Sequence, residues 1–81
     1  MTFKKVKLLD IQPKDSARYK LFKSHIGQIT PCSVEVGERG YFGGMVTSPI
    51  NNISQEGNVL KVEAAEVVYT LEILDEYKQN N

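Results

Sequence analysis

A chain of 81 residues, 41% of them hydrophobic and 25% charged, has the size of one globular domain, and its composition excludes extensive disorder. The net charge at pH 7 is zero, but residues 1–24 carry a balance of +5 and residues 25–81 a balance of −5. This asymmetry has two explanations: a basic surface for nucleic acid, or neutralisation between neighbouring parts of the fold. A chain this short buries only about 60% of its unfolded surface, which favours a compact barrel or a homo-oligomer.

The cysteine content and the apolar runs indicate the compartment. Cys32 is the one cysteine, so the chain has no internal disulfide. The first ten residues place lysines among the apolar residues, unlike a signal peptide. No apolar run approaches the roughly 20 residues of a membrane span. We therefore expect a cytoplasmic protein without a membrane contact.

The N-terminal half begins with a predicted strand at Phe3–Ile11, where apolar and polar residues alternate. The following segment, residues 12–25, is predicted to be a long and partly ordered loop with one or two helical turns capped by Asp15 or Ser16. Leu21 or Phe22 is expected to pack on the core from this loop.

The central part is predicted to form two further strands. The first covers residues 26–36, and because Pro31 has no N–H, this strand lies at an edge or contains a bulge at Pro31. A turn is predicted at residues 37–40, where the glycines of "GERG" tolerate positive φ. The next strand covers "YFGGMVTS", residues 41–48, and a polar loop at residues 49–57 follows it.

The C-terminal part is predicted to form the fourth and fifth strands. Residues 58–64 alternate around Leu60 and Val62, and residues 66–76 place four apolar side chains on one face. These four are Val67, Tyr69, Leu71 and Ile73. We expect one domain over residues 1–76 and a flexible C-terminal tail at residues 77–81.

Five short strands and one long loop predict a mainly β protein that forms a small closed or half-closed barrel. The strand order resembles that of SH3-like barrels. The segment "KSHIGQI", residues 23–29, is similar to the entry into the second strand of the KOW-type members. The resemblance implies that the first and last strands pair, which places Lys4, Lys5 and Lys7 near Glu72, Asp75 and Glu76. It also implies a binding role, because such barrels occur as accessory proteins of phages and mobile elements.

Tyr41 and Phe42, the aromatic pair in "RGYFGG", are expected on opposite faces of a strand, since neighbouring residues of a strand point to opposite sides. Phe42, on the face of Val46, is predicted to enter the core. Tyr41 shares its face with Gly43 and Met45, so its ring would lie beside a bare patch suited to stacking with a base or a proline. The paired glycines are predicted to bend the strand.

The sequence carries no catalytic signature. His25 and Cys32 are seven positions apart, so on one regular strand they face opposite ways, and a buried structural cysteine is the expected role of Cys32. One His and one Cys fall short of a zinc site, and the glycines form no phosphate-binding loop. We therefore expect no enzyme activity, no cofactor and no metal.

Two binding interpretations remain. The first is a protein-interaction or regulatory module with an unidentified protein partner, which uses the long loop and Tyr41. The second is a nucleic-acid-binding accessory protein that uses the basic loop at residues 14–23 and responds strongly to salt. Both use the same candidate residues: Lys14, Arg18, Tyr19, Lys20, Lys23 and Tyr41.

Overall fold

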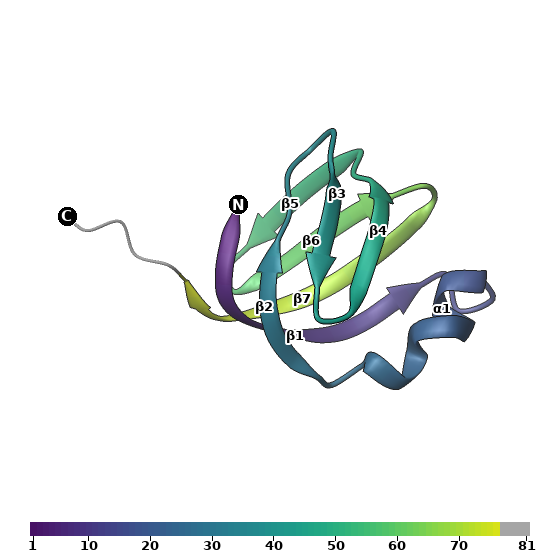
Figure 1. Ribbon diagram of the computed structural model, residues 1–81, viewed down its shortest axis with the longest axis horizontal. Helices are drawn as coiled ribbons and strands as arrows, with labels where there is room; N and C mark the ends of the chain where they lie inside the picture. The colour runs from purple at the N-terminus through teal and green to yellow at the C-terminus, as the bar shows by residue number, and fades with distance from the viewer. Residues whose placement is uncertain (77–81) are drawn as a thin grey trace.

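The computed structural model describes residues 1–76, which form a single antiparallel sheet and one short helical segment (Figure 1). The sheet order is β4-β3-β2-β1-β7-β6-β5. The tail predicted at residues 77–81 lies outside the described residues. The elements are β1 (Thr2–Gln12), α1 (Ala17–Phe22), η1 (Lys23–His25), β2 (Ile29–Ser33), β3 (Arg39–Phe42), β4 (Met45–Pro49), β5 (Asn52–Glu56), β6 (Val59–Ala64) and β7 (Val67–Glu76).

One face of the curled sheet forms the core. Alternation along β6 and β7 directs every second side chain to this inner face, as the sequence predicts for the fourth and fifth strands. In β1, register shifts interrupt the alternation, and the buried residues are Phe3, Val6, Leu8 and Ile11. The rings of Phe42 and Tyr69 meet edge to face at a centroid distance of 5.3 Å. The core residues with the largest fully buried side chains are Tyr69, Ile11, Met45, Ile50, Leu60, Leu71, Val6, Val34 and Val62.

The first and last strands pair at the centre of the sheet. β1 runs antiparallel to β7 along almost its whole length. The register sets Lys5 opposite Asp75 and Lys7 opposite Glu72. Opposite charges across a ladder contribute about 0.2–1 kcal/mol per pair. The pairing therefore joins a basic strand to an acidic one, which accounts for part of the charge asymmetry within the fold.

The sheet has seven strands among residues 1–76, not the predicted five. The segment read as one bent strand is a hairpin, in which Phe42 pairs with Met45 across the two-residue turn Gly43–Gly44. Gly43 has φ +65°, which favours glycine. The predicted loop at residues 49–57 contains β5, whose burial pattern shows no regular alternation because four of its five residues are exposed.

The sheet is also open, so of the closed or half-closed barrel that the sequence predicted, full closure is not found among residues 1–76. Its end strands, β4 and β5, do not pair with each other. The chain passes from one edge to the other at residues 49–52, where Ile50 forms an isolated parallel bridge with Val36. The N–H of Gly37 donates to the carbonyl of Ile50 at 2.8 Å. Beyond this bridge the two edges are not joined.

The boundaries around β2 differ from the prediction. β2 is shorter than residues 26–36, and the chain turns earlier, since the N–H of Glu38 donates to the carbonyl of Glu35 at 3.1 Å. Arg39 and Gly40 consequently belong to β3 instead of the turn. At Pro31 the prediction left an edge or a bulge open. The β1–β2 register shifts opposite Pro31, but the extra residue lies on β1, between Phe3 and Val6, and β3 does not pair with β2 beyond Cys32.

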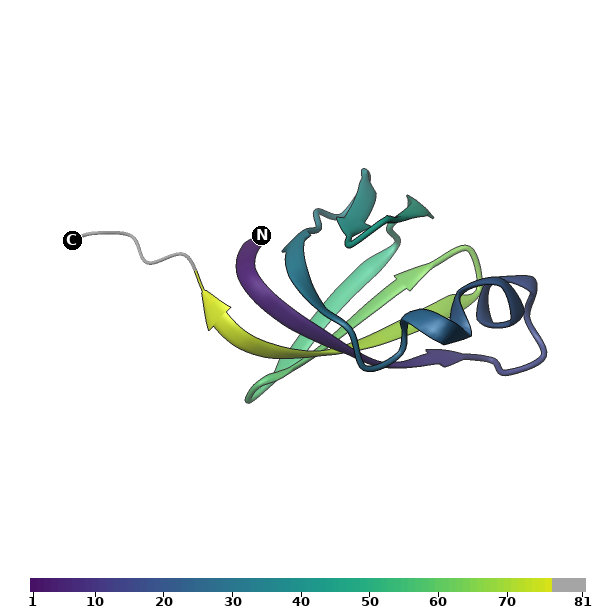
Figure 2. The ribbon, with the colours of Figure 1, turned by 60° about the horizontal axis from the view of Figure 1, so that its bottom comes forward.

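The helical segment follows β1, as predicted. Ser16 is the N-cap of α1, and its hydroxyl accepts a hydrogen bond from the N–H of Tyr19 at 3.1 Å. Tyr19, Phe22 and Ile26 pack against the core, whereas Leu21 is 68% exposed. Figure 2 shows α1 at one end of the molecule, opposite the end of β7.

We expect Thr47→Val to lower the free energy of unfolding by about 1–3 kcal/mol, because it leaves a buried donor without an acceptor. The Thr47 hydroxyl is fully buried, accepts from the N–H of Gly40 at 2.8 Å and donates to the carbonyl of Ser48 at 2.6 Å. Urea unfolding measures the loss. Thr47→Ser is the control, since it keeps the hydroxyl and should keep the Gly40 amide protected from hydrogen exchange. Wild-type stability in Thr47→Val would contradict this role.

Candidate functional site

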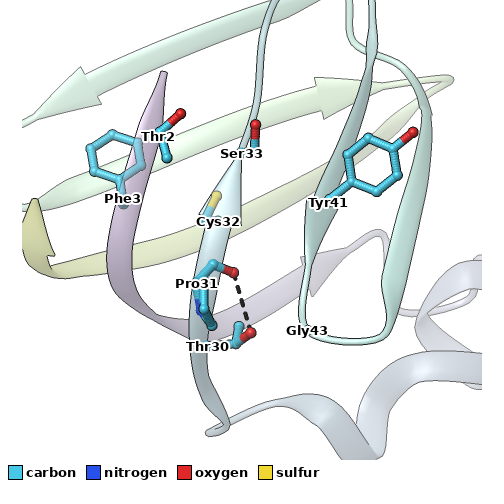
Figure 3. Close-up of a pocket in the computed structure, with 8 residues that line it drawn as sticks. All are labelled: Thr2, Phe3, Thr30, Pro31, Cys32, Ser33, Tyr41 and Gly43. Atoms are coloured by element: carbon cyan, nitrogen blue, oxygen red, sulfur yellow. Dashed lines mark hydrogen bonds between the residues drawn. The ribbon is translucent and has the colours of Figure 1, made fainter. Parts of the chain in front are cut away.

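A hollow of about 270 Å³ opens beside the ring of Tyr41, at the strands β1, β2 and β3 (Figure 3). In Figure 3, β2 lies between Tyr41 on β3 and the side chains of Thr2 and Phe3 on β1. We call this site the Tyr41 hollow. Its lining contains no Lys, Arg, His, Asp or Glu. The lining residues are Thr2, Phe3, Thr30, Pro31, Cys32, Ser33, Tyr41 and Gly43.

Strand alternation places Tyr41 on the outer face. Its neighbour Phe42 is buried, as predicted, and the Tyr41 side chain is 53% exposed. Tyr41 pairs with Ser33 of β2 on one side and with Val46 of β4 on the other. Because the chain reverses at Gly43–Gly44, Val46 lies on the outer face with Tyr41 and Met45 is buried. The predicted faces of Val46 and Met45 are therefore wrong, whereas the bare glycine beside Tyr41 does line the hollow.

Pro31 forms the wall of the hollow on the β2 side. The β2–β3 pairing reaches only Cys32, so the backbone at Pro31 has no partner on β3. The Thr30 hydroxyl donates to the Pro31 carbonyl at 3.2 Å. The bulge in β1 opposite Pro31 breaks the ladder on the other side. A proline without an N–H therefore fits here without loss of a sheet hydrogen bond, and its ring remains exposed at the surface.

Arg18, a predicted binding residue, has a structural contact. Phe42 and Met45 flank a two-residue turn and form a hydrogen-bonded pair, so the backbone groups of the next residue, Val46, point away from β3. The Arg18 guanidinium donates to this outward Val46 carbonyl at 2.7 Å. It also lies 5.1 Å from the centroid of the Phe22 ring. Arg18 thus joins α1 to the edge of the sheet and covers part of that edge.

The other predicted residues lie on or beside α1. Tyr19 is half-buried and packs against the core, which leaves little of its ring for a ligand. Lys14, Lys20 and Lys23 are exposed, and none of them lines the Tyr41 hollow. The structure therefore brings one of the six candidates, Tyr41, into a hollow. The β2 side of that hollow, Thr30 and Ser33, was missed because its position beside Tyr41 depends on the β1–β2 and β2–β3 registers, which local patterns do not determine.

The single thiol and imidazole occupy different elements. Cys32 is buried in β2, and burial raises the pKa of its thiol to about 12, with a small opposing effect of the N-terminal charge. A thiol with this pKa is protonated at neutral pH. His25 lies in η1, where its Nδ1 is 3.1 Å from the Gln28 side-chain oxygen and its ring meets the edge of Phe22. The imidazole therefore has partners other than Cys32.

In comparisons with known proteins, the chain matches no family model, no curated protein and no solved structure. Residues 1–76 contain no group of three or more His, Cys, Asp or Glu side chains placed to hold a metal ion. No helix in this part of the chain is both long and apolar enough to cross a membrane.

Burial of Cys32 predicts a specific loss of stability at alkaline pH. Below pH 9, the ordinary pKa of the thiol, both states keep the proton. Between pH 9 and about 12 the unfolded state releases it first, so the free energy of unfolding falls as the pH rises. Relative to Cys32→Ser, which does not titrate here, the wild type should lose about 1 kcal/mol between pH 8 and pH 10 in urea unfolding. Parallel pH profiles of the two proteins would contradict the raised pKa.

Proposed function

We propose that this chain is a non-catalytic interaction module that binds an extended segment of a partner protein at the Tyr41 hollow. The observation that carries the proposal is an exposed tyrosine ring beside a hollow without charged side chains, bordered by the exposed Pro31. Tyrosine is enriched among the residues that dominate binding energy, and charged residues are depleted from the centres of interfaces. Aromatic grooves of this kind accept proline-containing extended segments.

The polar groups of the hollow suit an extended peptide. Ser33 and Thr2 lie on its rim as exposed hydroxyl residues, opposite each other on neighbouring strands. Hydroxyls both donate and accept hydrogen bonds, so they can serve the carbonyls and amides of a peptide backbone. The ring of Tyr41 supplies contact area at a small cost in side-chain entropy. Ring and hydroxyls together provide an apolar contact and a means of orienting the ligand.

Nucleic-acid binding by residues 14–23 is less well supported. Lys14, Lys20 and Lys23 are exposed cations, which favours it. Arg18, however, already donates to Val46 and stacks on Phe22, and the hollow offers no cation for a phosphate. Three phosphate contacts would give a slope of log K against log salt of about −2 to −3.

The proposed resemblance to SH3-like barrels rests on two features. The first and last strands pair, and a long excursion follows the first strand. The open sheet and the additional strands are departures from that pattern. The function proposed here depends on the hollow and not on this resemblance.

The test is capture of a partner by the tagged protein from a lysate of the organism that makes it, with and without nuclease. We expect a discrete protein that survives nuclease and moderate salt, is lost or weakened at least tenfold with Tyr41→Ala, and is kept with Leu74→Ala. Leu74 is the matched control because it is also an exposed large apolar residue on the sheet, but on β7.

Two outcomes would contradict the proposal. Capture that disappears with nuclease, or with combined replacement of Lys14, Lys20 and Lys23 by Gln, would assign the function to nucleic acid. Equal capture by Tyr41→Ala and wild type would place the binding surface elsewhere on the molecule.

A further inference from the structure

A second hollow, of about 300 Å³, lies beside β5, one of the two end strands of the sheet. Met1, Glu35 and Val36 line one side, and Ile53 and Gln55 of β5 line the other. The two sides are joined at the bridge between Val36 and Ile50 and lie apart beyond it. We call this site the seam.

β5, whose Ile53 and Gln55 line the seam, has an unpaired backbone edge. Glu56 and Val59 flank the two-residue turn Gly57–Asn58 and form a hydrogen-bonded pair with each other. The pairs of an antiparallel ladder alternate, so the N–H and C=O groups of Gln55 and Ile53 point away from β6. β5 ends the sheet, and within residues 1–76 no strand pairs with this edge. Such an edge accepts an added strand.

The side chains around the seam leave apolar surface exposed. Met1 is 48% exposed and Val36 56% exposed, although both lie against a hollow that reaches Ile53, which packs on the core. A strand added to β5 would direct alternate side chains to the inner face of the sheet, beside Ile53. Apolar residues at those alternate positions would cover Met1 and Val36.

Carboxylates outnumber cations on and beside β5. Glu35 lines the seam with a side chain that is 67% exposed, and the N-terminal amine of Met1 contacts it at 3.1 Å. On the outer face of the β5–β6 hairpin, Glu56 and Glu63 are exposed together with one cation, Lys61, which lies opposite Ser54. A ligand with cations on its solvent-facing positions complements these carboxylates.

We propose that the free edge of β5 binds an extended segment of a partner protein as an eighth strand, and that this segment alternates basic and apolar residues. Backbone hydrogen bonds to Ile53 and Gln55 supply affinity, and the apolar residues fill the seam. The basic residues lie on the outer face of the sheet, where Glu56 and Glu63 outnumber Lys61. This site is separate from the Tyr41 hollow and does not depend on the function proposed for it.

The probe is a capped seven-residue peptide of alternating lysine and valine, titrated into the full chain and followed by amide NMR shifts. We expect the shifts to centre on Ile53 and Gln55. Gln55→Pro removes the outward N–H at an edge position that tolerates proline, and should weaken binding by about two- to tenfold relative to Gln55→Ala, which keeps the N–H. The same peptide with glutamate for lysine, or with proline for its central valine, should bind at least several-fold more weakly.

Four results would overturn the proposal. They are the absence of binding at millimolar peptide, equal affinity of the Gln55→Pro and Gln55→Ala variants, shifts confined to the Tyr41 hollow, and sedimentation showing that a second copy of the chain already occupies the β5 edge. Shifts confined to the Tyr41 hollow would support the function proposed for that hollow and contradict strand addition at β5. The experiment therefore distinguishes failure of one proposal from failure of the other.

Discussion

The antiparallel pairing of β1 with β7 is the interaction on which the rest of the structure depends. These are the two longest strands, and they lie together in the middle of the sheet order. Together they supply about half of the buried hydrophobic residues of the core. The pairing joins the two ends of the described chain, and the entropy lost on closing such a loop grows only slowly with its length. Each remaining strand attaches to one side of this pair.

The two sides of the β1–β7 pair end in different kinds of sheet edge. On one side, β2 and the β3–β4 hairpin follow β1, and Arg18 covers the outward carbonyl of Val46 at that edge. On the other side, the β6–β7 and β5–β6 hairpins end in an edge that no described strand covers. The segment at residues 49–52 connects these edges covalently without pairing them along their length. β5 therefore keeps one unpaired edge in the described chain.

The sequence predicted the elements that have a clear alternation. Val67, Tyr69, Leu71 and Ile73 point to one face as expected, and the strand around Leu60 and Val62 was also correct. β5 was missed because an edge strand exposed on most of its length carries polar residues, which resemble those of a loop. The glycine pair was misread because a bend and a two-residue turn require the same residues, and only the pairing of Phe42 with Met45 separates them.

Of the candidate site, local alternation predicted the exposure of Tyr41 but not its neighbours across the sheet. Exposure of Tyr41 follows from burial of its neighbour Phe42, which local alternation is enough to predict. The partners of Tyr41 across the sheet, Ser33 and Val46, depend on strand register, which single-sequence patterns do not determine. The contact of Arg18 with Val46 joins residues 28 positions apart, so no local pattern could indicate that this cation is engaged.

The most direct test of this account is residue-resolved amide hydrogen exchange of the intact chain. If the β1–β7 pair holds the sheet together, the slowest amides will lie in those two strands and approach the free energy of global unfolding. The outward amides of Ile53 and Gln55 will exchange much faster, because no strand covers them. Slow exchange at both of these amides would contradict the open edge, and slower exchange in the hairpins than in β1 and β7 would contradict the central role of the pair.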